Sequence, residues 1–168
     1  MDITKLENVQ RNFTRRIEGM EEFDYWERLQ ELKLNSLERR RERYMIIYTW
    51  KILMGYAPNI EGRNEIKPDD NLRRGLLCKV PYLNPHNTRF RTLKENSFVV
   101  KGPRLFNKLP YSIRQECVGI SPDAFKTKVD KFLSTIPDKP KLPGTEYSQQ
   151  AESNSLLHQI RYAQIEQT

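Results

Sequence analysis

The chain has almost none of the residues that build metal sites and disulfide frameworks. Its 168 residues include two cysteines, Cys78 and Cys117, which lie 117 − 78 = 39 positions apart, and two histidines, His86 and His158. Neither cysteine belongs to a CxxC pair, and the spacings to the histidines match no common zinc module. We therefore expect two reduced thiols, no metal ion and no other cofactor.

Long apolar segments are also missing. The longest apolar run, residues 45–54, is interrupted by Thr49 and Lys51, and it is far shorter than the ~20 residues that cross a bilayer. The sequence starts at Met1 without the apolar stretch of a secretory signal. Hydrophobic residues make up 37% of the chain, against about 45–50% in typical globular domains. These features predict a soluble, intracellular protein with a modest core and no association with membranes.

The sequence lacks the patterns of the common catalytic sites. In reverse transcriptases, an Asp-Asp pair that follows an aromatic residue and one spacer helps to hold two metal ions. The only such pair here, Asp69-Asp70, follows Lys67-Pro68 in a polar segment. There is no glycine-rich phosphate loop, and the scattered histidines and cysteines form no nucleophile–base pattern. We expect no enzymatic activity and no small-molecule substrate.

What the sequence does contain is a concentrated positive charge. Residues 71–114 hold ten Lys and Arg against one acid, Glu95, which gives 10 − 1 = +9 in 44 positions, whereas the rest of the +7 chain sums to 7 − 9 = −2. A localised cationic surface predicts a polyanionic partner, here RNA or DNA, whose phosphates it neutralises. The predicted nucleic-acid-binding residues are Arg73, Arg74, Lys79, Tyr82, Arg89, Arg91, Lys94, Lys101, Arg104 and Lys108. Arg114 is the tenth basic residue of this segment.

Aromatic residues are interleaved with these charges and offer faces on which bases can stack. Tyr82, which lies between Pro81 and Asn84, is the best candidate for an exposed ring. Phe90, Phe98 and Phe106 have a competing interpretation, because a small domain needs large apolar side chains for its core. We favour the core for these three phenylalanines.

Helices are predicted in the first third of the chain. Ile3, Leu6, Val9, Phe13 and Ile17 recur at helical spacing, which predicts a first helix that packs through this apolar stripe. Asp24 and Glu27 have the spacing of a capping box for a short second helix.

A third helix is predicted over about 37–54, capped by Asn35 or Ser36 and ended by Gly55. Its second half is apolar nearly all round, which predicts burial on every side. Ile47, Trp50 and Leu53 are the expected core residues.

Prolines at 81, 85, 103 and 110 argue against a long helix in the basic segment. Short strands are predicted at 76–80, 89–93 and 97–101, followed by a short helix from about 102 to 108. Ser121 and Pro122 open a closing helix that ends before Pro137. Beyond it, the polar composition predicts disorder.

These patterns together predict a mainly α fold. It consists of a small helical domain of about four to five helices, a basic irregular segment with short β-strands, and a disordered C-terminal tail. The expected parts are a helical region (1–56), a hinge loop (57–71), the basic segment with the closing helix (72–136) and the tail (137–168). The helical region and the basic segment are expected to form one domain.

Several stretches, in order, resemble the C-terminal region of reverse transcriptases from non-LTR (LINE/jockey-like) retrotransposons. They are residues 6–17 (LENVQRNFTRRI), 25–41 (YWERLQELKLNSLERRR), 46–53 (IIYTWKIL), 89–91 (RFR), 106–110 (FNKLP) and 125–133 (FKTKVDKFL). Phe106 departs from the pattern, because the family often has Trp there, and the zinc knuckle of some relatives is missing.

The resemblance implies a fragment of an RNA-directed DNA polymerase, because the catalytic palm of that family lies upstream of this region. The implied function is non-catalytic binding of template RNA or target DNA. Two alternatives stay open: a protein-interaction module that docks on a polymerase core supplied by a longer chain, and a non-functional remnant of a retroelement.

Overall fold

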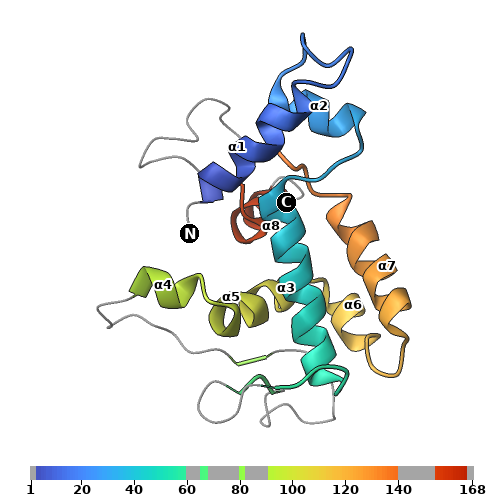
Figure 1. Cartoon of the computed structure of the whole chain (residues 1–168). Coiled ribbons are helices and arrows are strands. Elements are labelled where there is room, and N and C mark those ends of the chain that lie inside the picture. Colours follow the sequence, from blue (N-terminus) through green and yellow to red (C-terminus); the bar gives the residue numbers. More distant parts are fainter. Residues whose placement is uncertain (1–2, 60–64, 68–79, 82–90, 140–153, 166–168) are drawn as a thin grey trace. The chain divides into compact units, whose positions relative to one another are not determined.

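The structure is a computed structural model that describes residues 3–59, 65–67, 80–81, 91–139 and 154–165 (Figure 1). Over these residues it is helical, without a strand, which confirms the predicted mainly α class. The helices are α1 (Ile3–Thr14), α2 (Tyr25–Glu31), α3 (Leu37–Leu53), α4 (Arg91–Glu95), α5 (Phe98–Phe106), α6 (Tyr111–Gln115), α7 (Pro122–Leu133) and α8 (Leu156–Ile165).

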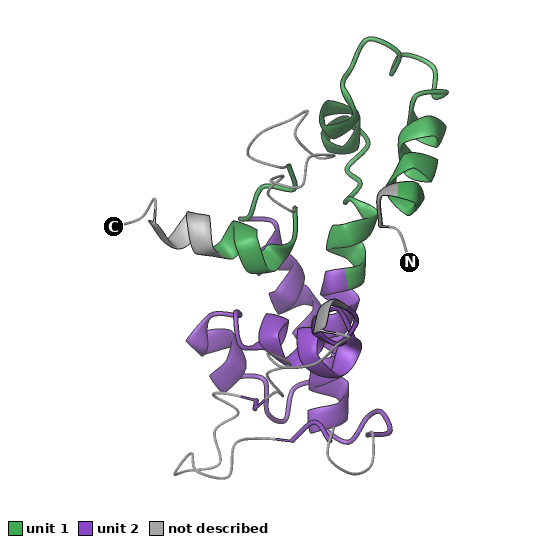
Figure 2. Ribbon diagram, turned by 90° about the vertical axis from the view of Figure 1, so that its left-hand side faces the viewer, with its two compact units in different colours: residues 1–41, 136–168 green, residues 42–135 purple. Residues whose placement is uncertain are grey.

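The chain forms two compact units, drawn in different colours in Figure 2. Unit 1 comprises Met1–Arg41 and Ile136–Thr168, and unit 2 comprises Glu42–Thr135. Helix α3 contributes residues 37–41 to unit 1 and residues 42–53 to unit 2. The division thus falls within a helix, and residues 57–71, where a hinge loop was predicted, belong to unit 2.

In unit 1, helix α1 turns a polar face inward, contrary to the predicted apolar stripe. Val9 and Phe13 are 66% and 69% exposed, whereas Gln10 and Thr14 are buried. The Gln10 side chain donates to the carbonyl of Asn35 (3.1 Å), and the Thr14 hydroxyl accepts from the buried Arg28 guanidinium (3.3 Å). The Gln10 amide N–H and the Thr14 hydroxyl thus have partners, which offsets the cost of burying them.

The predicted helix starts of unit 1 are confirmed by their hydrogen bonds. The Asp24 carboxylate accepts from the backbone N–H of Glu27 (2.9 Å), and the Glu27 side chain accepts from the Asp24 N–H (2.8 Å). The Ser36 hydroxyl accepts from the Arg39 N–H (3.1 Å) at the start of α3. Glu7 of α1 adds a second anion there, because it accepts from the Leu37 and Glu38 N–H groups, where the helix dipole favours negative charge.

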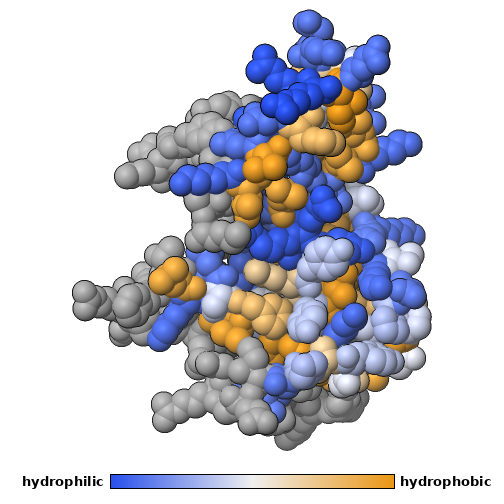
Figure 3. Space-filling model, viewed as in Figure 1, coloured by the Kyte–Doolittle hydropathy of each residue, from blue (hydrophilic) through white to orange (hydrophobic). Residues whose placement is uncertain are grey.

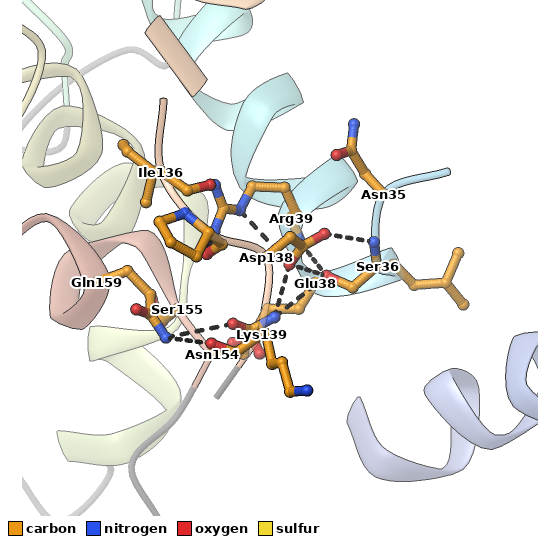
Figure 4. Close-up of polar contacts among 12 residues, drawn as sticks. Asn35, Ser36, Glu38, Arg39, Ile136, Asp138, Lys139, Asn154, Ser155 and Gln159 are labelled. Carbon is orange, nitrogen blue, oxygen red and sulfur yellow. Dashed lines mark hydrogen bonds and ion pairs between the residues drawn. The ribbon is translucent and has the colours of Figure 1, made fainter. Parts of the chain in front are cut away.

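A buried polar cluster ties the segment after α7 to the start of α3 (Figure 4). The Asp138 carboxylate accepts from the Ser36 backbone N–H (2.7 Å), the Ser36 hydroxyl (2.8 Å) and the Asn154 amide (2.7 Å). The Arg39 guanidinium, 1% exposed, donates to the carbonyls of Ile136 and Pro137. These side chains bind one another, so the cluster stabilises unit 1.

The core of unit 2 is built around Trp50, which is fully buried as predicted. Its ring stacks on Phe125 of α7 with centroids 4.4 Å apart, and its indole N–H donates to the carbonyl of Cys117 (2.9 Å). Ile47 is also buried, as predicted, and Leu53 is partly exposed. Cys117 is buried, and its thiol donates to the Arg114 carbonyl (3.0 Å), whereas Cys78 lies outside the described residues.

The predicted strand at 97–101 is wrong, because these residues begin helix α5 at Ser97. Within this helix, Phe98 contacts Gly102, and Leu105 and Phe106 are completely buried. This spacing has the period of a helix, and its burial outweighs the β-propensity of the two valines. Pro103 lies inside α5, so the helix begins earlier than the predicted start at 102.

The structure bears differently on the two other predicted strands, 89–93 and 76–80. Residues 91–93 of the predicted strand 89–93 belong to helix α4, and residues 89–90 lie outside the described residues. Of the predicted strand 76–80, only Val80 is described, and it lies in a loop. The side-chain amide of Asn107 donates to the Val80 carbonyl and accepts from its N–H, both at 2.8 Å. Val80 thus pairs with a side chain and not with a neighbouring strand.

The predicted disorder of the tail is wrong for residues 154–165. Helix α8 lies here, and Leu156 and Ile160 are buried together with Asn154 and Gln159. The polar residues of this segment bind partners within unit 1: Asn154 binds Asp138, and the Gln159 amide donates to the Lys139 carbonyl (3.1 Å). Polar residues of the segment that was predicted to be disordered therefore take part in the buried cluster of Figure 4.

Candidate nucleic-acid interface

The charge of the chain is divided unequally between the two units. Unit 2 contains 17 Lys and Arg against nine Asp and Glu, a net charge of 17 − 9 = +8. Unit 1 contains 12 basic and 13 acidic residues, a net charge of 12 − 13 = −1. A surface that attracts polyanions is therefore to be sought on unit 2.

Half of the predicted binding residues lie outside the described part of unit 2. They are Arg73, Arg74, Lys79, Tyr82 and Arg89. Arg91 is the first residue of α4, where the backbone alone is described. These six positions remain predictions from the sequence.

Four cations of the basic segment lie at or near the surface. Lys94 is exposed on α4, and Arg104 of α5 and Lys108 just after α5 are half-buried. Arg114 on α6 is half-buried and donates from Nε to the Leu109 carbonyl (3.0 Å). Among the predicted residues whose side chains are described, Lys94 is thus the one whose exposure best suits contact with a phosphate.

Lys101 occupies a different position, because its side chain is buried in an ion pair. Its Nζ lies 2.7 Å from Oε1 of Glu42 on α3, and the two side chains are 9% and 0% exposed. The pair joins α5 to α3 and neutralises the charge of Lys101 inside unit 2. Glu42 stands within a run of arginines in the sequence, and this local pattern does not predict a partner as distant as Lys101.

Two tyrosines on α3 are exposed, which was not predicted from the sequence. Burial on every side was predicted for this part of the helix, yet Tyr44 and Tyr48 are 62% and 48% exposed. The spacing of polar and aromatic residues along α3 does indicate an exposed side. Tyr44, Tyr48 and the partly exposed Lys51 follow one another at steps of four and three, whereas the buried Ile46 and Trp50, also four apart, lie on the opposite side.

The two tyrosine rings are held by different neighbours. The Tyr48 ring meets Phe98 of α5 edge to face, with centroids 5.8 Å apart and planes at 80°. The guanidinium of Arg43 lies 5.4 Å from the centroid of the Tyr44 ring, and Arg43 is itself anchored by Asp130 through two hydrogen bonds. We call Tyr44, Tyr48, Lys51 and Phe98 the tyrosine face. In Figure 3, side chains of intermediate hydropathy (pale) over α3 adjoin hydrophobic side chains over α5.

The cations of helix α7 are mostly compensated by nearby acids. Lys126 Nζ lies 2.9 Å from Asp123, and Lys128 pairs with Glu116. The hydrogen bond from Lys126 lowers the pKa of the Asp123 carboxyl, and the charge of Lys51 lowers it further. Exposed pairs of this kind contribute little stability, but they reduce the positive potential on this side of unit 2.

Comparison with known proteins identifies no relative: no protein-family model, curated protein or solved structure matches the chain. In the described part of the chain, no three His, Cys, Asp or Glu side chains are grouped so that they could hold a metal ion. No described helix is long and apolar enough to cross a membrane. The interpretation of unit 2 therefore depends on its charge and its exposed aromatic residues.

Proposed function

We propose that the chain is a non-catalytic, nucleic-acid-binding fragment of the C-terminal region of a non-LTR retrotransposon reverse transcriptase. Unit 2 holds RNA or DNA through its basic surface. The observation that carries the proposal is the net charge of +8 on unit 2 beside −1 on unit 1. Neutralised phosphates release counterions, so such a surface binds nucleic acid with an affinity that falls steeply with salt.

The first test is the salt dependence of binding. The intact chain is titrated against a fluorescent single-stranded RNA and the equivalent DNA at several salt concentrations. Each phosphate contact contributes about 0.7 to the slope of log affinity against log salt for a single strand. Replacing Arg89 and Arg91 by Ala should reduce the slope by about 1 or more.

The matched control removes the same charge from α7. Lys126→Ala/Lys128→Ala deletes two cations that are already paired with Asp123 and Glu116, and its slope should stay close to that of the wild type. A wild-type slope near zero would contradict nucleic-acid binding. Equal losses of slope in the two double variants would show that net charge acts without a defined surface.

A second function is favoured by one observation on unit 1. Val9 and Phe13 leave an apolar face of α1 uncovered, and apolar side chains reach the surface over α1 in Figure 3. Exposed apolar patches commonly mark protein interaction sites. Under this alternative the chain docks on a polymerase core, and the isolated chain self-associates through this face. Val9→Ser/Phe13→Ser should then reduce the sedimentation coefficient without changing the salt slope.

A further inference from the structure

The proposed function leaves open which form of nucleic acid unit 2 prefers, and the tyrosine face bears on this choice. From the geometry of this face we infer that Tyr44 and Tyr48 form a base-stacking platform for single-stranded RNA or DNA. The inference rests on the proposed function and adds a site that the basic segment does not contain. Both tyrosines lie outside the residues 71–114 from which the binding surface was predicted.

The spacing of the two tyrosines along α3 suits neighbouring bases. Residues four apart on a helix lie side by side, with Cβ atoms about 5–6 Å apart. Tyr44 and Tyr48 are both about half or more exposed, so ring surface is open to solvent at two adjacent positions. Proteins that bind single strands without sequence preference use aromatic rings in this way, one base on each ring.

Neighbouring side chains hold the two tyrosine rings in defined positions. The edge-to-face contact with Phe98 supports the Tyr48 ring from α5. Arg43, fixed by Asp130, lies over the Tyr44 ring. A ring that is already held by its neighbours loses less conformational entropy when a base stacks on it, and this improves affinity.

The charges beside the platform suit a phosphate backbone. Lys51 lies on the same stripe of α3 as the tyrosines. Lys94 is exposed at the end of α4, and its carbonyl accepts from the Ser97 hydroxyl one residue before Phe98. Cations are therefore available next to both aromatic helices of the tyrosine face, in a unit with a net charge of +8. Sites that bind single-stranded nucleic acid combine aromatic faces with a cationic surface.

A duplex would not use this platform, because its base faces are covered by stacking within the helix. The tyrosine face should therefore distinguish single strands from duplexes, whereas the basic surface alone attracts both. This difference provides a measurement that general electrostatic attraction does not affect.

The test compares two double variants of the intact chain at the same positions. Tyr44→Leu/Tyr48→Leu removes the rings and keeps apolar bulk, whereas Tyr44→Phe/Tyr48→Phe keeps the rings. Affinities for a labelled oligothymidylate of about 16 nucleotides and for a duplex of similar length are measured by fluorescence anisotropy at several salt concentrations. Circular dichroism and sedimentation verify that each variant retains its fold and its oligomeric state.

The Leu variant should bind the single strand at least about tenfold more weakly than the wild type. Its salt slope and its duplex affinity should be unchanged, and the Phe variant should bind as the wild type does. As a direct readout, an oligonucleotide that carries 5-iodouracil should crosslink to Tyr44 or Tyr48 on irradiation.

Each other outcome overturns a particular statement. If the wild type shows no salt-dependent binding, the proposed function and the platform both fail. If the wild type binds and the Leu variant binds equally well, the platform fails while the proposed function stands. Equal losses in the Leu and Phe variants would exclude stacking as the cause. A changed oligomeric state in the Leu variant, with unchanged binding, would assign the tyrosine face to a second copy of the chain.

Discussion

Single buried side chains determine much of the local structure, and Lys101 with Glu42 is the clearest case. Their charged atoms lie 2.7 Å apart, almost without access to solvent. A buried ion pair compensates for lost hydration only while both partners are present. The side-chain amides of Asn59 and Asn107 act in a related way, because each binds both backbone groups of one residue, Ile66 and Val80 respectively.

Removing one member of the buried pair should therefore be costly. Lys101→Met leaves the Glu42 carboxylate buried without its cation and should lower the free energy of unfolding by about 3–5 kcal/mol. The double variant Glu42→Leu/Lys101→Met removes both charges and should recover most of this loss. Urea unfolding followed by circular dichroism measures both values. A cost below about 1 kcal/mol for the single variant would show that water reaches the pair.

At the scale of elements, the stability that the Asp24 cap contributes to helix α2 depends on pH. The hydrogen bond from the Glu27 N–H, supported by that from Trp26, holds the pKa of the Asp24 carboxyl below its usual value. A depressed pKa contributes stability that is present above the unfolded pKa of about 3.9 and is lost as the pH falls through the folded pKa.

The expected result is a steeper loss of melting temperature in the wild type than in Asp24→Asn between about pH 5 and pH 2. Asn caps a helix nearly as well as Asp but does not titrate. Thermal melts at a series of pH values test this prediction. Parallel curves for the two proteins would show that the cap carries no charge-dependent stability.

The contact between α5 and α3 depends on Gly102. A Cβ at this position would lie 2.7 Å from the hydroxyl oxygen of the buried Thr49 and 3.0 Å from the Phe98 ring. Gly102→Ala should therefore destabilise the protein by about 1–3 kcal/mol, although Ala favours helices by about 1 kcal/mol over Gly.

Thr49→Ala is the matched second substitution, because it removes the hydroxyl that the methyl group introduced by Gly102→Ala would contact. In a double-mutant cycle, Gly102→Ala should cost less in the Thr49→Ala background than in the wild type. Chemical denaturation of the four proteins completes the cycle. A stabilising effect of Gly102→Ala in the wild-type background would mean that α5 shifts away from Thr49 at little cost.

At the scale of the whole molecule, each unit carries one of the two tryptophans. Trp26 lies in unit 1 and Trp50 in unit 2, and both are buried. Helix α3 supplies residues to both units, and short helical pieces are marginal without tertiary packing. We therefore expect the units to unfold together.

Two single-tryptophan proteins test this expectation. In Trp26→Phe the fluorescence reports unit 2, and in Trp50→Phe it reports unit 1. In each protein, the urea midpoint from fluorescence should coincide with that from far-UV circular dichroism. Separated midpoints in either protein would show that the units are independent.

Local signals in the sequence were reliable where the residues involved are close neighbours along the chain. The Asp24–Glu27 box and the Ser121 cap with Pro122 form as predicted, since their geometry is set within one turn. Gly55 adopts the predicted positive φ after α3. Among the described residues that were predicted to bind nucleic acid, Lys94 is exposed and Lys101 is buried, and the exposure of Tyr44 and Tyr48 was not predicted. Which side of a helix is covered depends on residues far along the chain.

By itself, the sequence determined the helical class, the caps, the Trp50 core and the concentration of charge in residues 71–114, because periodicity, capping and composition are local properties. Tertiary structure decided which helix faces are buried. It turned the polar side of α1 inward, converted the predicted strand at 97–101 into α5, and buried Lys101 against Glu42. It also ordered residues 154–165 around Asp138. The physical reason is common to all four: buried polar groups need hydrogen-bond partners and buried apolar groups need a surface to pack against, and only the folded chain supplies both.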